Sequence, residues 1–164
     1  SIGVGSVPHQ VMTRIGAKLG ISWRHVPYKG SAPAHADLQG GHIQAASDTT
    51  GWTPLVEAGK LRLLAVYGEQ RLKKFPDVPT LRELGLDIAD ESPWGLAAPR
   101  GVPADRISIV HDAAWKALRD PDFIAALDAM SNQVKYMSTQ QYEDYMAARV
   151  PIEKQVVDKY LRQQ

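Results

Sequence analysis

The segment from His25 to Pro33 carries the side chains best suited to binding a small anion. Its sequence, HVPYKGSAP, is typical of a strand end, a short polar turn and the first turn of a helix. A helix start presents unpaired backbone N–H groups and the positive end of the helix dipole, which together favour anions. The turn adds a phenol, a cation, a flexible backbone and a hydroxyl, supplied by Tyr28, Lys29, Gly30 and Ser31. The segment therefore predicts a site for a carboxylate or a phosphate.

Two other polar turns follow predicted strands. Gly5 and Ser6 end the first strand, and His9 falls in the first turn of the helix that follows. Asp48 and Thr49 end the third strand. Asp48 has two open interpretations: it caps the next helix, or it accepts a hydrogen bond from an ammonium, a hydroxyl or a bridging water. We expect all three turns to contribute ligand contacts.

The first 67 residues alternate strand-like and helix-like patterns. Strands are predicted over residues 1–5, 21–26, 42–47 and 61–67, and helices over 8–19, 31–38 (with Ser31 as N-cap) and 52–58. The apolar run 61–67 is typical of a strand buried on both faces. Such alternation predicts an α/β fold with a mainly parallel sheet flanked by helices. Right-handed crossovers then bring the carboxyl ends of the strands to one edge, where ligands bind in open α/β sheets.

The remainder of the chain is predicted to be mostly helical. Thr80 is expected to cap a short helix to Leu84, and two further strands are expected over 88–91 and 94–98. After a linker at 99–103, helices are predicted over 104–119 and 121–130, with an edge strand at 133–136 between them and a last helix from residue 138 or 139. Pro151 should kink or break that last helix.

Several classes of function are disfavoured by composition and motifs. Nineteen Lys and Arg residues balance 18 Asp and Glu residues without a basic block, which argues against nucleic acid and anionic membranes as partners. There is no cysteine, and the five histidines lack metal-site spacing, so no metal site is predicted. Gly3-x-Gly5 continues to Pro8, and Lys29 precedes Gly30, so neither nucleotide motif is present and no cofactor is expected. No apolar run is long enough to cross a bilayer, and no signal peptide is visible.

The sequence resembles the substrate-binding proteins of tripartite tricarboxylate transporters, also called the Bug family. The matching motifs follow one another along nearly the whole chain: HVPYKGSAPA at 25–34, DLxGG at 37–41, the strand ending at Asp48, EAGKLR at 57–62, LAV at 64–66, PDVPTLxExG at 76–85, WGLxAP at 94–99 and GVP at 101–103. The resemblance implies a secreted, periplasmic receptor without enzymatic activity. It also implies a periplasmic-binding-protein-like fold of two α/β lobes that close on a small carboxylate, which is then delivered to a membrane transporter or a sensor.

The resemblance also implies that this chain is a fragment. Family members are about twice as long, so residues 1–93 correspond to the second, ligand-closing lobe. Residues 94–164 correspond to a crossover segment and C-terminal helices that pack on a first lobe outside this sequence. We therefore expect exposed apolar surface on those helices, which could drive self-association. Departures from the family pattern at 5–9 and 49–52 predict an altered ligand preference, with Trp52 as a candidate aromatic wall.

Two other functions stay open at this point. A small α/β hydrolase or transferase would need a nucleophile beside a base, yet Ser6 and Ser31 lie outside any Gly-x-Ser-x-Gly motif. An assembly or sensor domain of the same fold would keep the scaffold and bind no ligand.

Overall fold

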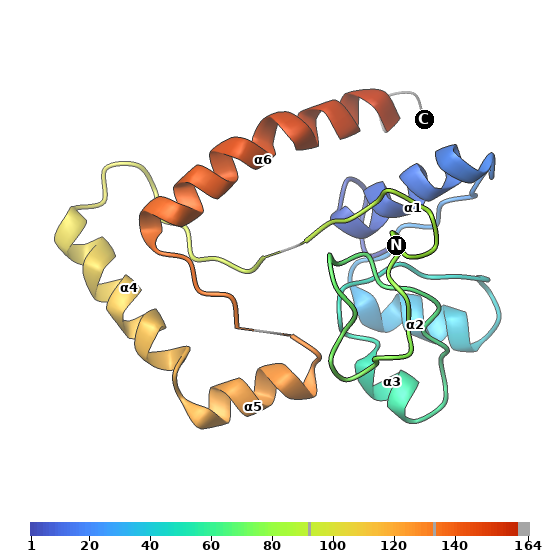
Figure 1. Cartoon of the computed structure of the whole chain (residues 1–164), viewed down its shortest axis with the longest axis horizontal. Coiled ribbons are helices and arrows are strands. Elements are labelled where there is room, and N and C mark those ends of the chain that lie inside the picture. Colours follow the sequence, from blue (N-terminus) through green and yellow to red (C-terminus); the bar gives the residue numbers. More distant parts are fainter. Residues whose placement is uncertain (92, 133, 161–164) are drawn as a thin grey trace. The chain divides into compact units, whose positions relative to one another are not determined.

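The computed structural model describes residues 1–91, 93–132 and 134–160 (Figure 1). The chain divides into two compact units, one made of residues 1–92 and 152–164 and the other of residues 93–151. The boundary after residue 92 lies close to the predicted one at residue 93, whereas residues 152–164 group with the first unit and not with residues 93–151. The assignment of the two parts to particular lobes stays a prediction.

Helix α1, Val7–Leu19, begins and ends at clear local signals. Ser6 is its N-cap and Pro8 lies in its first turn, while Gly20 ends the helix at a φ of 67°. That left-handed conformation is disfavoured for side chains other than glycine, so the helix stops where the sequence predicts. Its buried face includes Val11 and Gly16.

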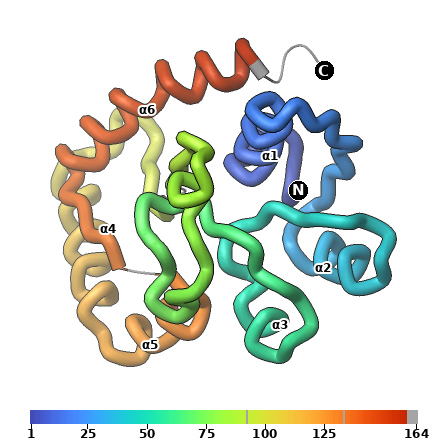
Figure 2. The backbone as a smooth tube through the Cα atoms, turned by 45° about the vertical axis from the view of Figure 1, so that its right-hand side comes forward, coloured from blue at the N-terminus to red at the C-terminus, as the bar shows by residue number. Residues whose placement is uncertain are grey.

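Helices α2, Ser31–Gln39, and α3, Thr53–Glu57, also belong to the first unit (Figures 1 and 2). The prediction that Ser31 caps α2 is wrong: Gly30 is the N-cap, at a φ of 104°, and Ser31 is the first helical residue. Glycine takes this position because its backbone conformation is open to few other residues. Helix α3 is shorter than predicted and begins after Trp52.

Extended pairing is sparse among the described residues. They form one isolated bridge, which joins Val66 to Thr80 in parallel, and no strand. The predicted parallel sheet therefore stays a prediction in its details. The expectation that residues 61–67 are buried on both faces is wrong, because Val66 is 7% exposed while Leu64 is 67% exposed. The single bridge leaves the preceding residues without a neighbouring strand to cover them.

The core of the first unit is built on α1 and the segment after the bridge. Val11, Leu81 and Ile88 form its buried cluster, and partly buried side chains pack around them: Val7, Ile15, Ala65, Tyr67 and Leu86. Arg14 contacts Asp90 at 3.3 Å and joins the same two regions. These contacts hold the start of α1, and with it the first polar turn, in place.

The predicted helix after Thr80 is instead a short hydrogen-bonded turn. The Thr80 N–H donates to Glu83 at 2.7 Å, and the Glu83 N–H donates to the Thr80 hydroxyl at 3.2 Å. This reciprocal pair is the capping box of a helix start, but the next residues do not continue the helix, and Gly85 follows at a φ of 83°. Arg71 donates to Glu83, and this hydrogen bond, with that from Thr80, lowers the pKa of the Glu83 carboxyl.

The second unit contains α4, Ala104–Ala117, α5, Pro121–Ala129, and the first part of α6, Thr139–Tyr160. These bounds lie close to the predicted ones. Pro151 was predicted to kink or break the last helix; it does not break it, because α6 continues through it. The predicted edge strand at 133–136 begins outside the described residues, and residues 134–136 are not a strand.

Apolar side chains are exposed on the helices of the second unit, as expected. Helix α4 has no buried residue, and its Ile109 and Val110 are 58% and 53% exposed. Phe123 of α5 and Met146 of α6 are 41% and 42% exposed. Within the described ranges, no helix is both long and apolar enough to span a bilayer.

Candidate functional site

The first polar turn is closed by its own hydrogen bonds. The Gly5 N–H donates to His9 Nδ1 at 3.0 Å. The Ser6 hydroxyl donates to the Gly3 carbonyl at 2.8 Å and accepts the His9 N–H at 3.4 Å, which caps α1. The predicted contacts Gly5, Ser6 and His9 thus form one local structure, with His9 only 4% exposed.

His9 stacks on His25, which precedes the second polar turn. The two rings are nearly parallel, at 12°, with centroids 3.9 Å apart. Burial and the neighbouring His9 lower the pKa of His25, with a smaller contribution from the chain's amino terminus. The stack brings the first and second polar turns side by side.

Ser1 adds further links between the turns. Its hydroxyl hydrogen-bonds His25 Nε2 at 2.8 Å, and its carbonyl accepts the Tyr28 N–H at 3.0 Å. Burial lowers the pKa of the Ser1 amine, and the charge of Asp48 opposes that shift.

The side chains of the second turn differ in their contacts and exposure. Tyr28 donates its hydroxyl to Asp37 at 2.7 Å, so the phenol is tied to the flank of α2, and this hydrogen bond raises the pKa of Tyr28. Lys29 is exposed. Gly30 and Ser31 provide the first backbone positions of α2. The turn therefore offers backbone donors at the helix start and a cation at its edge.

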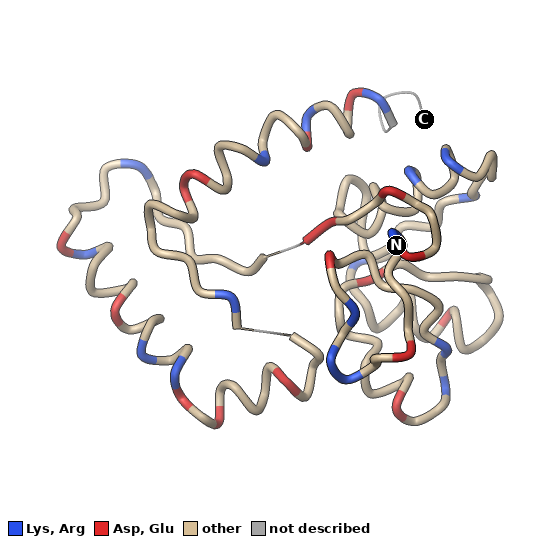
Figure 3. Tube along the Cα trace, viewed as in Figure 1, with Lys and Arg blue, Asp and Glu red and all other residues tan. Residues whose placement is uncertain are grey.

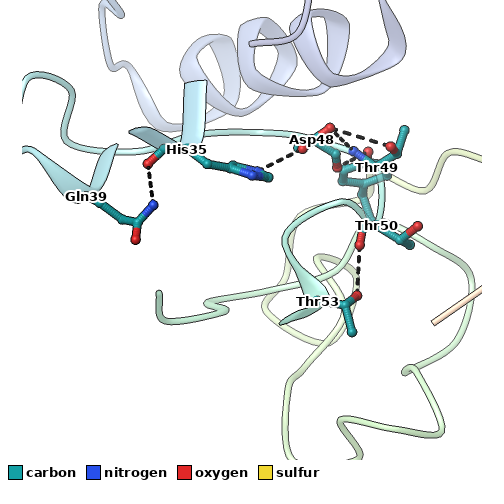
Figure 4. A network of polar contacts seen from close by, with 7 residues as sticks. His35, Gln39, Asp48, Thr49, Thr50 and Thr53 are labelled. Carbon is teal, nitrogen blue, oxygen red and sulfur yellow. Dashed lines mark hydrogen bonds and ion pairs between the residues drawn. The ribbon is translucent and has the colours of Figure 1, made fainter. Parts of the chain in front are cut away.

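Asp48 lies at the centre of a buried polar network (Figure 4). His35 Nε2 lies 2.9 Å from Asp48 Oδ2, and the two side chains are 7% and 2% exposed. The Thr49 N–H donates to Asp48 Oδ1 at 2.6 Å. The Tyr67 hydroxyl donates to the Asp48 carbonyl at 2.6 Å, and its burial together with the Asp48 charge raises the Tyr67 pKa. Asp48 does not cap α3, whose N-cap residue Trp52 makes no side-chain hydrogen bond to the helix.

Gly51 brings the second and third turns into contact. A Cβ at this position would lie 3.2 Å from Ser31 Oγ and 3.6 Å from Asp48 Oδ2. The Ser31 hydroxyl and the Asp48 carboxylate therefore both lie close to one backbone position that carries no side chain. Thr53, fully buried, donates its hydroxyl to the Thr50 carbonyl at 2.8 Å and fixes the turn from below (Figure 4).

The sequence argument missed His35 and Tyr67. His35 was one of five histidines without metal-site spacing, and Tyr67 belonged to an apolar run. One signal was available: His35 lies four residues after Ser31, one helical turn along the same face of α2. Trp52, the candidate aromatic wall, packs against Phe75 with ring centroids 5.6 Å apart.

Charged residues of both signs are distributed along the described chain (Figure 3). The described part of the sequence contains no group of three or more His, Asp or Glu side chains arranged to hold a metal ion. What the three turns bring together is a set of hydroxyl and backbone donors beside one buried, partnered carboxylate.

Comparison with known proteins identifies the family. The model for the tripartite tricarboxylate transporter family receptor matches residues 1–161. The chain belongs to this receptor family. A relative from Cupriavidus necator, named UPF0065 protein in gbd 5'region, is 41% identical over 151 residues, which cover 92% of this chain and 46% of the relative. The resemblance found in the sequence is confirmed, and the chain spans about half the length of the curated relatives it matches.

Solved structures agree with this assignment. The periplasmic binding protein BugD matches with a TM-score of 0.88 and 27% identity, covering 97% of this receptor chain and 55% of BugD. The structure of an R. palustris protein with adipate matches with a TM-score of 0.85 and 26% identity. The match covers 95% of this chain and 54% of that protein. MatC from Rhodopseudomonas palustris, with bound malate, matches with a TM-score of 0.81 and 25% identity. The match covers 93% of this chain and 53% of MatC. The chain therefore has a periplasmic-binding-protein-like fold, and its relatives are binding proteins, not enzymes.

Proposed function

We propose that this receptor chain supplies one side of a binding site for a small carboxylate, in an extracytoplasmic protein that serves a tripartite tricarboxylate transporter or a sensor. The observation that carries the proposal is the meeting of three polar turns, with Ser31 at the start of α2 facing the turn that follows Asp48. The relatives crystallised with adipate and malate support the choice of ligand class.

The backbone of the second turn is the proposed anchor for the acid. The N–H groups of Gly30 and Ser31 point from the start of a nine-residue helix, where a carboxylate is favoured by the helix dipole. Lys29 adds positive charge at the rim, and Tyr28, held by Asp37, borders it. Charge-assisted hydrogen bonds of this kind are about twice as strong as neutral ones.

The other two turns are proposed to complete this side of the site. Gly5, Ser6 and His9 form the first turn, and Thr49 offers a hydroxyl on the third. Asp48 is proposed to act through the network that shapes this turn, because both of its carboxylate oxygens already contact protein groups. Residues 1–93 are proposed to be the ligand-closing lobe. Closure would follow from tighter binding of the acid to the closed state.

The proposal is tested by thermal shift of the full-length gene product against a panel of acids that includes malate, adipate, citrate and neutral analogues. One acid should raise the melting temperature in proportion to the logarithm of its concentration, because only the native state binds it. Ser31→Pro removes one backbone donor at the first helical position, which tolerates proline, and should reduce that shift. Thr139→Pro at the start of α6 is the matched control.

The alternatives give different outcomes in the same experiment. An assembly or sensor domain without a ligand would respond to none of the acids, and its helices of residues 94–164 would self-associate. A hydrolase or transferase would convert a substrate in a manner that depends on Ser6 or Ser31. Turnover of that kind would overturn the proposal. The Ser6 hydroxyl donates to a backbone carbonyl, which does not activate it as a nucleophile.

A further inference from the structure

A histidine outside the three polar turns contacts the buried Asp48 carboxylate. His35 lies on α2, one helical turn after Ser31, and its Nε2 reaches Asp48 Oδ2 at 2.9 Å. The contact is almost fully buried, with side-chain exposures of 7% and 2%. It therefore holds the carboxylate on the inside of the turn.

The remaining contacts of Asp48 act in the same sense. Its other carboxylate oxygen accepts the Thr49 N–H at 2.6 Å, and its backbone carbonyl accepts the Tyr67 hydroxyl at 2.6 Å. Groups from α2, from the turn itself and from residue 67 thus contact a single acidic residue. A buried carboxylate is tolerated when neighbouring groups compensate its charge, and removing one of those groups is costly.

The position of this carboxylate matters because it lies beside the proposed anchor for an acid. Asp48 Oδ2 and Ser31 Oγ lie 3.6 Å and 3.2 Å from the point where a Gly51 side chain would begin. An unpaired negative charge there would repel an incoming carboxylate, and the repulsion would grow with the ligand's own charge.

We propose that His35 is a positioning residue of the receptor site: through its buried contact with Asp48 it holds that carboxylate inward, so that the turns around Ser31 present donors to an anionic ligand. The inference rests on the proposed function. In this role His35 makes the site prefer dianionic acids to monoanionic ones, and it does so without contacting the ligand.

The test compares malate and adipate with their monomethyl esters, which keep the carbon chain and lose one charge. Calorimetric titration of the full-length protein is carried out for the wild type, His35→Leu, His35→Gln and His35→Leu/Asp48→Asn. We expect His35→Leu to weaken binding of the diacids at least tenfold and binding of the esters threefold or less. His35→Gln keeps a donor on the same helix face and should recover most of the affinity. The double variant has no charge to hold inward and should bind the diacids more tightly than His35→Leu does.

The outcomes separate the two proposals. If the wild type binds neither diacid, the proposed function fails and this inference fails with it. If the wild type binds and His35→Leu weakens diacids and esters equally, or the double variant is no better than His35→Leu, the histidine has only a structural role and the inference alone is overturned. If His35→Leu does not fold, the double variant and His35→Gln decide: loss of diacid preference in both would refute the inference.

Discussion

The substitution Gly16→Ala should affect stability in two opposite ways, through helix propensity and through packing. Gly16 is buried on α1. An alanine Cβ there would lie 2.7 Å from the Ile21 carbonyl oxygen, 2.7 Å from Trp23 Cδ1 and 2.8 Å from Trp23 Nε1. All three distances are shorter than real Cβ contacts. The Ile21 oxygen cannot move away freely, because the N–H of the same residue donates to the Gly16 carbonyl at 2.9 Å.

The two effects have known sizes and opposite signs. Replacing glycine by alanine inside a helix stabilises it by about 1 kcal/mol. Overpacking a tightly filled site costs about 1–3 kcal/mol. The obstacles here are a backbone oxygen and a rigid indole, so we take the upper part of that range. The expected net result is a loss of about 1–2 kcal/mol in the free energy of unfolding.

Urea denaturation followed by tryptophan fluorescence measures this change. Ala17→Gly is the matched control, because Ala17 is exposed on the same helix and its replacement should cost about 1 kcal/mol through propensity alone. Gly16→Ala should also alter the native emission of Trp23, whereas the control should not. A Gly16→Ala protein that is more stable than the wild type by about 1 kcal/mol would refute the reasoning, since propensity would then be the dominant effect.

Two further predictions concern the core and the stacked histidines. Ile88→Ala should lower the free energy of unfolding by about 2–5 kcal/mol, because the side chain is fully buried in a small core. Ile88→Val, measured by the same urea denaturation, should lower it by about 0.5–1.5 kcal/mol. Equal losses for the two variants would contradict this account. Burial and His9 lower the pKa of His25 below its ordinary 6.5, so the unfolded chain binds more protons near that pH and stability should fall as the pH drops through it. His25→Asn should lose less stability than the wild type between pH 7.5 and pH 5.5, and an unchanged loss would assign the dependence to other groups.

Helix positions were largely predictable because their signals are local. Ser6 and Gly20 bound α1, and Asp120 caps α5 through the N–H groups that follow it. The errors arose where neighbouring residues or tertiary contacts decide. Gly30 took the cap that was assigned to Ser31, and the capping box at Thr80 ends in a turn, not a helix. Strand pairing depends on partners distant in sequence, which an apolar run such as 61–67 does not specify.

The proximity of the polar turns was predictable from the sequence, but the contacts within them were not. The positions of the polar turns after predicted strands indicated that Gly5, Tyr28 and Asp48 lie near one another. In the structure, Ser1 and the stacked histidines link the first and second turns. The roles of individual side chains depended on contacts that have no sequence signature. The Tyr28 phenol is bound to Asp37, and the Asp48 carboxylate is bound to His35.

Pro151 within α6 should affect how this helix opens locally. Pro151 has no N–H, so the Ala147 carbonyl lacks its usual donor one turn back in the helix. The division of the chain into two units falls between Pro151 and Ile152, at this missing hydrogen bond. The two parts of α6 should therefore exchange their amide hydrogens as separate cooperative segments, each with the unit to which it belongs. A single continuous helix would then contain the boundary between two independently opening regions.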